Sequence, residues 1–150
     1  MLFSVLVGIP LTIATVAIHA VGTSWWIARL RRSESAYDRP HTIGTTIQVL
    51  SRTAVVLLLL TLSEVIVWAA VYRILPGDSG VTSWEQAVYF SAVTFPSLGY
   101  GDVVLIAGWR LLSAIQATVG LLIFGWSTAM LFAVIQQCWK AEGKFDESRL

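Results

Sequence analysis

Three long apolar runs alternate with shorter polar segments along the chain. Residues 1–28 and 111–139 contain no Asp, Glu, Lys or Arg, and residues 53–72 contain only one, Glu64. A helix needs about 20 mostly apolar residues to cross a bilayer. Because hydrocarbon offers no water to backbone polar groups, such runs form helices. The pattern therefore predicts an all-α membrane protein with three transmembrane helices.

The first run is interpreted as a retained helix over 1–28 rather than a cleaved signal peptide. It lacks a basic segment at its start, and Ile18-His19-Ala20 is a poor cleavage site. It is also longer than the apolar core of a typical signal peptide.

Basic residues set the expected orientation. A connector, 29–52, and a tail, 140–150, carry most of them, whereas the segment 73–110 carries only Arg73 and Arg110. Because Lys and Arg accumulate on the cytoplasmic side, we expect the connector and the tail there. The N-terminus is then outside and the C-terminus cytoplasmic, in the cell (inner) membrane. The apolar spacing within 42–50 also suggests an interfacial helix that leads into the second span.

The segment between the second and third spans predicts a half-membrane helix over 83–95. Thr82 with Glu85, or Ser83 with Gln86, has the spacing of a capping box at its start. Pro96 disfavours a helical conformation in the residue before it, so the helix must end there. Its length is about half of a bilayer. Irregular backbone after such a helix is tolerated only where protein or water surrounds it.

The residues after this helix favour a backbone with aligned carbonyls. Gly99 and Gly101 flank Tyr100 and supply dihedral angles that side chains would forbid. Rings of carbonyls can replace the water shell of a small cation. The preceding helix points its negative C-terminal end at the same place, which also favours a cation there.

Residues 97–102, Ser-Leu-Gly-Tyr-Gly-Asp, resemble the selectivity filter of potassium channels, usually Thr-Val-Gly-Tyr-Gly-Asp. The order of helix, pore helix, filter and helix over 53–139 is similar to the two-helix potassium channel pore. Trp109, Gly120 and the pair Phe124-Gly125 resemble further positions of that family. The resemblance implies a potassium-channel-like homotetramer with an outer helix 53–75, a pore helix 83–95, a filter 97–102 and an inner helix 110–139. The first helix is an addition to this plan.

The resemblance also implies roles for single residues. The carbonyls of Ser97, Leu98, Gly99 and Tyr100, with the Ser97 hydroxyl, would hold potassium. Gly101 and Asp102 would form the outer mouth, and Trp84 or Tyr89 would brace Tyr100 from behind. The inner helix would present to the cavity a face whose residues share a helical spacing. These residues are Leu121, Phe124, Thr128 and Phe132, with Phe132 as a hydrophobic gate.

Departures from the family pattern leave other functions open. Ser97 and Leu98 replace threonine and valine, Pro96 replaces a polar residue, and Val93 stands where some members have glutamate. Potassium selectivity is the first prediction. The alternatives are a weakly selective monovalent cation channel and a non-conducting membrane scaffold subunit.

Several residues within the spans have two interpretations. Glu64 either supports the filter through the pore helix or makes a structural contact in the bundle, since buried carboxylates in membranes face the protein interior. His19 is either a pH sensor or, by default, a packing residue. It is expected nearer the inner end of its helix, and thus at a different depth from Glu64. Gly120 and Gly125 are either hinges or sites of close helix packing. Gln116 is expected to contact the back of the pore helix.

Composition narrows the function classes. Hydrophobic residues make up 56% and charged residues 13% of the 150-residue chain, about half the charge of a soluble domain. The net charge of +1 excludes a strongly basic nucleic-acid binder, and a single cysteine, Cys138, excludes an intrachain disulfide framework. The spans offer only Glu64 and His19 as titratable groups, so we predict no enzyme and no cofactor. The expected partners are further copies of the chain, the lipid bilayer and monovalent cations, with potassium as the permeant ion.

Overall fold

A computed structural model describes residues 2–34, 43–75 and 80–141 of the chain. Four helices account for most of them: α1 (Leu2–Glu34), α2 (Ile43–Ile74), α3 (Trp84–Thr94) and α4 (Arg110–Ala141). Residues 76–79, the middle of the basic connector at 35–42 and most of the tail, 142–150, lie outside the described residues.

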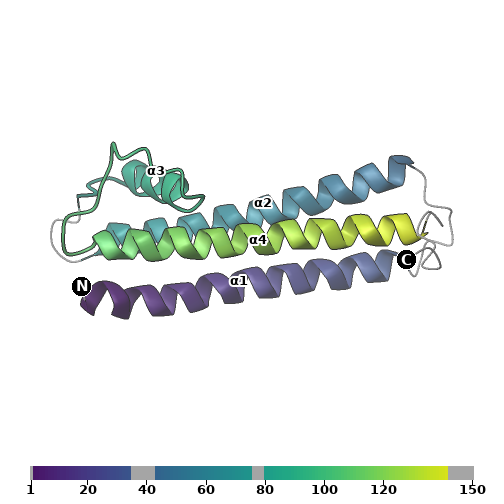
Figure 1. Ribbon diagram of the computed structural model, residues 1–150, viewed down its shortest axis with the longest axis horizontal. Helices are drawn as coiled ribbons and strands as arrows, with labels where there is room; N and C mark the ends of the chain where they lie inside the picture. Colours follow the sequence, from purple (N-terminus) through teal and green to yellow (C-terminus); the bar gives the residue numbers. More distant parts are fainter. Residues whose placement is uncertain (1, 35–42, 76–79, 142–150) are drawn as a thin grey trace, which may run out of the picture.

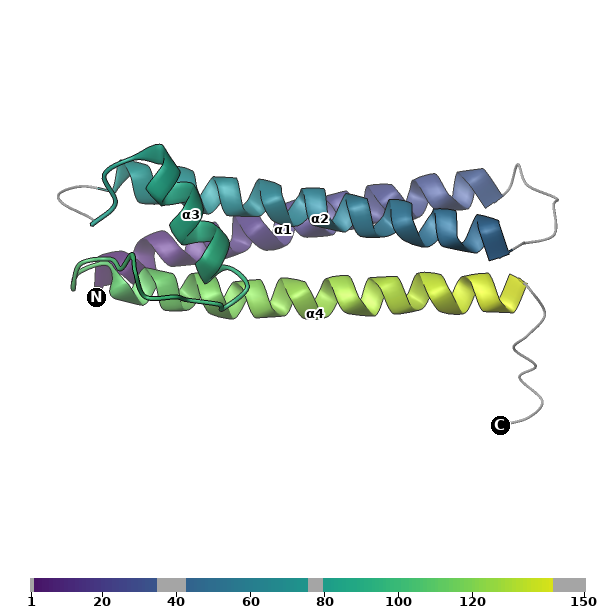
Figure 2. The same ribbon diagram turned by 90° about the horizontal axis from the view of Figure 1, so that it is seen from above.

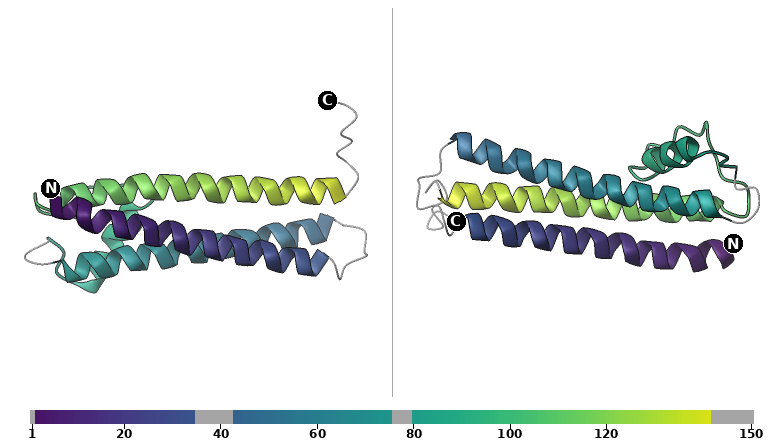
Figure 3. Two further views of the ribbon diagram at one scale, coloured as in Figure 1. Left: turned by 90° about the horizontal axis from the view of Figure 1, so that it is seen from below. Right: turned by 180° about the vertical axis from the view of Figure 1, so that it is seen from behind.

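The three long helices lie side by side, and the short α3 lies at one end of them (Figure 1). The view from above shows α3 crossing between α2 and α4, near the start of α1 (Figure 2). α1 contacts α2 and α4 but not α3, and it covers the side of these two helices that α3 leaves free (Figure 3). Each long helix is long and apolar enough to cross a membrane. The prediction of an all-α membrane protein with three spans is confirmed.

The helices α1 and α2 extend further than the apolar runs. α1 continues to Glu34, and α2 begins at Ile43, so residues 43–50 continue the second span instead of forming a separate interfacial helix. Both extensions contain arginine, leucine or glutamine, which are good helix formers, and no proline. Arg31 and Arg32 in the last turn of α1 also interact favourably with the helix dipole. Helical structure therefore continues beyond the hydrophobic segment.

The short helix α3 begins and ends for reasons visible in the sequence. Ser83 is the N-cap, and its hydroxyl accepts a hydrogen bond from the backbone N–H of Gln86 (3.1 Å). The side-chain Oε1 of Gln86 accepts from the backbone N–H (3.0 Å) and the hydroxyl (2.9 Å) of Thr82, the residue before the N-cap. Phe95 is the C-cap and keeps helical angles (φ −57°, ψ −47°), so the helix ends because Pro96 has no N–H with which to continue it and not, as expected, because Phe95 leaves the helical region. Of the two capping pairs considered, the structure uses Ser83 and Gln86, with the Gln86 side chain bonded to Thr82 instead of the N-cap N–H.

The buried core lies where α3 meets the longer helices. Trp68 and Tyr72 of α2 are fully buried, and the Tyr72 ring meets the edge of Phe90 in α3 at 5.0 Å between centroids. Leu112 and Ile123 of α4 close the cluster. This packing of large side chains fixes α3, and the segment that follows it, relative to α2 and α4.

Candidate functional site

The filter segment, residues 97–102, alternates between left-handed and ordinary backbone conformations. The φ angles of Ser97, Gly99 and Gly101 are 60°, 51° and 79°, whereas those of Leu98 and Tyr100 are negative. A backbone that alternates in this way is what the expected row of aligned carbonyls needs, and the alignment itself stays a prediction. A positive φ is uncommon for a serine and is tolerated only where the surrounding structure holds it.

Two backbone hydrogen bonds hold the start of the filter segment against the end of α3. The N–H of Ser97 donates to the carbonyl of Thr94, and the N–H of Gly99 donates to the carbonyl of Val93, both at 2.9 Å. Within the described part of the chain, no hydrogen bond ends on the carbonyls of residues 97–100. These carbonyls are therefore free for a ligand.

The Ser97 hydroxyl points to α4 in the single chain. It donates to the carbonyl of Ala117 at 3.3 Å. The hydroxyl oxygen still has lone pairs to offer, so a direct contribution to a cation site stays a prediction.

The outer end of the filter segment is tied to α3 by a hydrogen bond between side chains. The Tyr89 hydroxyl donates to Oδ2 of Asp102 (2.7 Å), and Oδ1 of Asp102 accepts from the N–H of Val103 (3.0 Å). The bond from Tyr89 holds the pKa of the Asp102 carboxyl below its ordinary value and raises the pKa of Tyr89. Asp102 is therefore anionic and fixed at neutral pH.

The aromatic support of Tyr100 was expected from Trp84 or Tyr89. In the described chain the Tyr100 ring pairs with neither ring, and 68% of its surface is exposed. Trp84 is also exposed, and Tyr89 contacts Asp102 instead. Within one chain these rings do not support Tyr100, so this support stays a prediction for an assembly of several chains.

Gly120 lies against the end of α3. A Cβ at this position would overlap the carbonyl oxygen of Phe95 and lie 2.7 Å from its carbonyl carbon. At Gly125 an added Cβ would meet nothing within 4 Å. Close packing is thus the structural reason for Gly120, whereas no packing reason exists at Gly125 in the single chain.

The proposed cavity face of α4 is exposed in the single chain. It comprises Leu121, Phe124, Thr128 and Phe132, and 70% of the Phe124 surface is exposed. The buried side of the same helix section carries Val119, Ile123 and Met130. The helix therefore turns its predicted pore face away from its own chain.

A buried polar chain connects α2, α3 and α4 behind the filter segment. Gln116 accepts from the Tyr72 hydroxyl (2.7 Å) and donates to the hydroxyl of Ser91 (2.7 Å), which donates to the carbonyl of Val65 (2.7 Å). The expected contact of Gln116 with the pore helix is confirmed.

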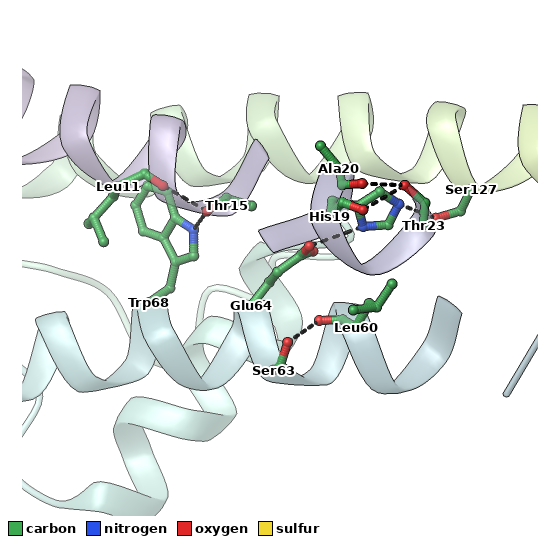
Figure 4. A network of polar contacts seen from close by, with 10 residues as sticks. All are labelled: Leu11, Thr15, His19, Ala20, Thr23, Leu60, Ser63, Glu64, Trp68 and Ser127. Carbon is green, nitrogen blue, oxygen red and sulfur yellow. Dashed lines mark hydrogen bonds and ion pairs between the residues drawn. The ribbon is translucent and has the colours of Figure 1, made fainter. Parts of the chain in front are cut away.

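Glu64 does not contact the pore helix through a hydrogen bond. Its Oε1 lies 3.0 Å from Nδ1 of His19, and Nε2 of His19 lies 3.3 Å from the Ser127 hydroxyl (Figure 4). The expectation that His19 and Glu64 lie at different depths is wrong. Because α1 continues to Glu34, His19 lies at its middle rather than near its inner end.

Sequence reasoning missed the partners of several buried polar groups. Trp68 donates to the hydroxyl of Thr15 (2.9 Å), and Trp26 donates to that of Thr53 (3.0 Å). Serine and threonine hydroxyls in a span can bond to a carbonyl of their own helix, as Thr12 and Thr128 do, so they carry no signal of a partner in another helix. The available signal was the buried tryptophan N–H, which usually finds a hydrogen-bond partner.

Comparison with known proteins agrees with this geometry. Residues 54–137, more than half of the chain, match the family described as ion channel. The chain belongs to this ion channel family and is a multi-pass membrane protein. No curated protein and no solved structure matches it.

Proposed function

We propose that the protein is a homotetrameric channel that conducts potassium selectively and passively through residues 97–101. The observation that carries the proposal is a filter segment whose φ angles alternate in sign and whose carbonyls at residues 97–100 accept no hydrogen bond from the described residues. One chain supplies only one wall of a carbonyl cage. Several copies around a common axis complete it, and the resemblance of the filter to those of potassium channels implies four.

The surroundings of the filter segment support a cation site. α3 ends directly before it, so the negative end of the helix dipole lies beside the site. Asp102 adds a fixed negative charge at the outer mouth. Both features attract cations and repel anions.

The exposed face of α4 supports a pore along the axis of such an assembly. Phe124 and Phe132 are 70% and 54% exposed in the single chain, so this face is available as a cavity wall or a subunit contact. Phe132, near the inner end, is proposed as a hydrophobic constriction that gates by dewetting. The tetramer sits in the cell (inner) membrane with its N-termini outside and its C-termini in the cytoplasm, and it uses no cofactor and catalyses no reaction.

A flux assay tests the proposal. The full chain is reconstituted into liposomes loaded with potassium or sodium, and efflux is followed with and without barium. The proposal predicts potassium efflux that barium blocks and a much slower sodium efflux. Equal efflux of both ions indicates a weakly selective channel. No efflux from wild type and from Phe132→Ala alike indicates a non-conducting scaffold.

A further inference from the structure

The end of α1 away from α3 carries a basic cluster outside the residues matched by the ion channel family (Figure 1). Arg29, Arg31 and Arg32 are exposed, and no carboxylate whose position the structure describes forms an ion pair with them. The connector 29–52 contains five arginines and two acidic residues, whereas the tail 140–150 contains three basic and three acidic residues. The excess of positive charge at this end of the spans therefore belongs to the connector.

The depth of the cluster follows from the contacts of α1. The Ser4 hydroxyl donates to the carbonyl of Gly108 (2.7 Å), so Ser4 lies level with the start of α4. About 20 residues of helix cross the hydrocarbon of a bilayer, which places Trp25 near its opposite boundary. At about 1.5 Å per residue, Arg29 and Arg32 lie roughly 6 and 10 Å further along, within reach of the lipid headgroups.

Trp25, Arg29 and Arg32 share one face of α1. Their helical spacing places the three side chains within roughly 60° of one another. The Arg29 guanidinium lies over the Trp25 ring, 6.0 Å from its centroid, and Val21 is exposed one turn earlier on the same face. Arg31 lies roughly 120° around the helix from Trp25. This face thus offers apolar surface at the depth of acyl chains and two positive charges at the depth of headgroups.

The neighbouring residue Trp26 turns this face away from the bundle. Trp26 is buried, and its indole N–H donates to the hydroxyl of Thr53 in α2 (3.0 Å), which donates to the carbonyl of Val49 (2.8 Å). Because Trp26 lies roughly 100° around α1 from Trp25, its bond to α2 directs Trp25 outward. The Trp25 surface is 60% exposed. The face is therefore held in place and open to the surroundings of the chain.

We propose that Trp25, Arg29 and Arg32 form a binding site for the phosphate headgroup of an anionic phospholipid, whose acyl chain lies along Val21. Two guanidinium groups bind phosphate oxygens through charge-assisted hydrogen bonds, and tryptophan favours the boundary between headgroups and acyl chains. A zwitterionic lipid is a weaker ligand because its own cationic group opposes the arginines. A second copy of the chain would bring the same positive charges to the contact.

The experiment measures lipid contact at Trp25 in the full chain. The protein is reconstituted into phosphatidylcholine liposomes that contain a small fraction of lipid with brominated acyl chains, which quench tryptophan fluorescence on contact. The brominated lipid is phosphatidylglycerol in one series and phosphatidylcholine in the other. We expect stronger quenching by the anionic lipid at equal fraction, and Trp25→Phe should remove this difference.

Single variants test the arginines. Arg29→Gln and Arg32→Gln should each lower the preference for the anionic lipid about fivefold, the contribution of one basic residue near an anionic surface. Arg31→Gln removes the same charge at nearly the same depth from another face of α1. It is the matched control and should leave most of the preference. Sodium chloride at about 0.5 M should weaken the preference of wild type, because it screens exposed charges.

Three results would overturn the site. The first is an equal loss of preference in Arg31→Gln and Arg29→Gln, which indicates attraction by total charge without a site on this face. The second is an unchanged preference in the double variant Arg29→Gln/Arg32→Gln. The third is a preference that persists in Trp25→Phe, which places the enriched lipid elsewhere. Because the readout is fluorescence, failure of the proposed channel function would leave these results unchanged.

Discussion

Replacing Gly120 by alanine places a methyl group at the contact between the inner helix and the end of the pore helix. The new Cβ would lie 2.7 Å from the carbonyl carbon of Phe95 and 3.2 Å from its Cα, and it would overlap the carbonyl oxygen. All three are backbone atoms, so no side chain can rotate away. The last turn of α3 must therefore shift relative to α4.

The size of the effect follows from two opposing terms. Overpacking of this kind costs about 1–3 kcal/mol per chain. Alanine in a helix interior is favoured over glycine by about 1 kcal/mol, which offsets part of the cost. The matched variant Gly125→Ala gains the same helix preference without any new contact, because nothing lies within 4 Å of its added Cβ. The difference between the two variants isolates the clash, about 1–3 kcal/mol.

The clash also acts on the filter segment. Thr94 and Val93, at the end of α3, accept the hydrogen bonds from Ser97 and Gly99. A shift of this turn disturbs both bonds, so Gly120→Ala should lower the ratio of potassium to sodium flux as well as stability. Thermal denaturation of the purified protein and liposome flux measure the two effects. If Gly120→Ala is as stable and as selective as Gly125→Ala, the close contact with Phe95 is wrong and a hinge role for Gly120 is favoured.

Three further predictions concern single contacts of the site. Tyr89→Phe removes the hydrogen bond that lowers the pKa of Asp102. Because the lowered pKa keeps the carboxylate charged to lower pH, potassium flux through the variant should fall at a higher external pH than flux through wild type. A flux titration between about pH 3 and pH 6 measures this difference. Gln116→Leu leaves the buried Tyr72 hydroxyl without its acceptor and should cost about 1–3 kcal/mol of stability in thermal denaturation. Adding Tyr72→Phe to this variant should recover part of the loss. No recovery would contradict the hydrogen bond between Tyr72 and Gln116. Phe132→Ala widens the proposed constriction and should raise resting potassium flux, whereas unchanged flux would remove Phe132 from the gate.

The fold follows closely from the sequence because its signals are simple. Long apolar runs with at most one charged residue become spans, Ser83 caps the short helix, and Pro96 follows its last residues. The left-handed backbone at Gly99 and Gly101 follows from their lack of a side chain. These features depend on residues that are near one another in the chain.

The contacts between helices are harder to predict. The pairing of His19 with Glu64 was missed because the first helix extends six residues beyond its apolar run, which moves His19 to its middle. The bond from Tyr89 to Asp102 depends on the path of the filter segment, and the contact of Gly120 with Phe95 depends on the angle between α3 and α4. Hydrophobic periodicity carries no information on either.

The central claim is that the filter segment selects potassium. The direct measurement is the zero-current potential across a planar bilayer that holds the full chain, with potassium on one side and an equal concentration of sodium on the other. A potassium-selective filter gives a potential strongly displaced from zero, with its sign set by the potassium gradient. A potential near zero, with current flowing, would contradict potassium selection by the carbonyls of Ser97, Leu98, Gly99 and Tyr100.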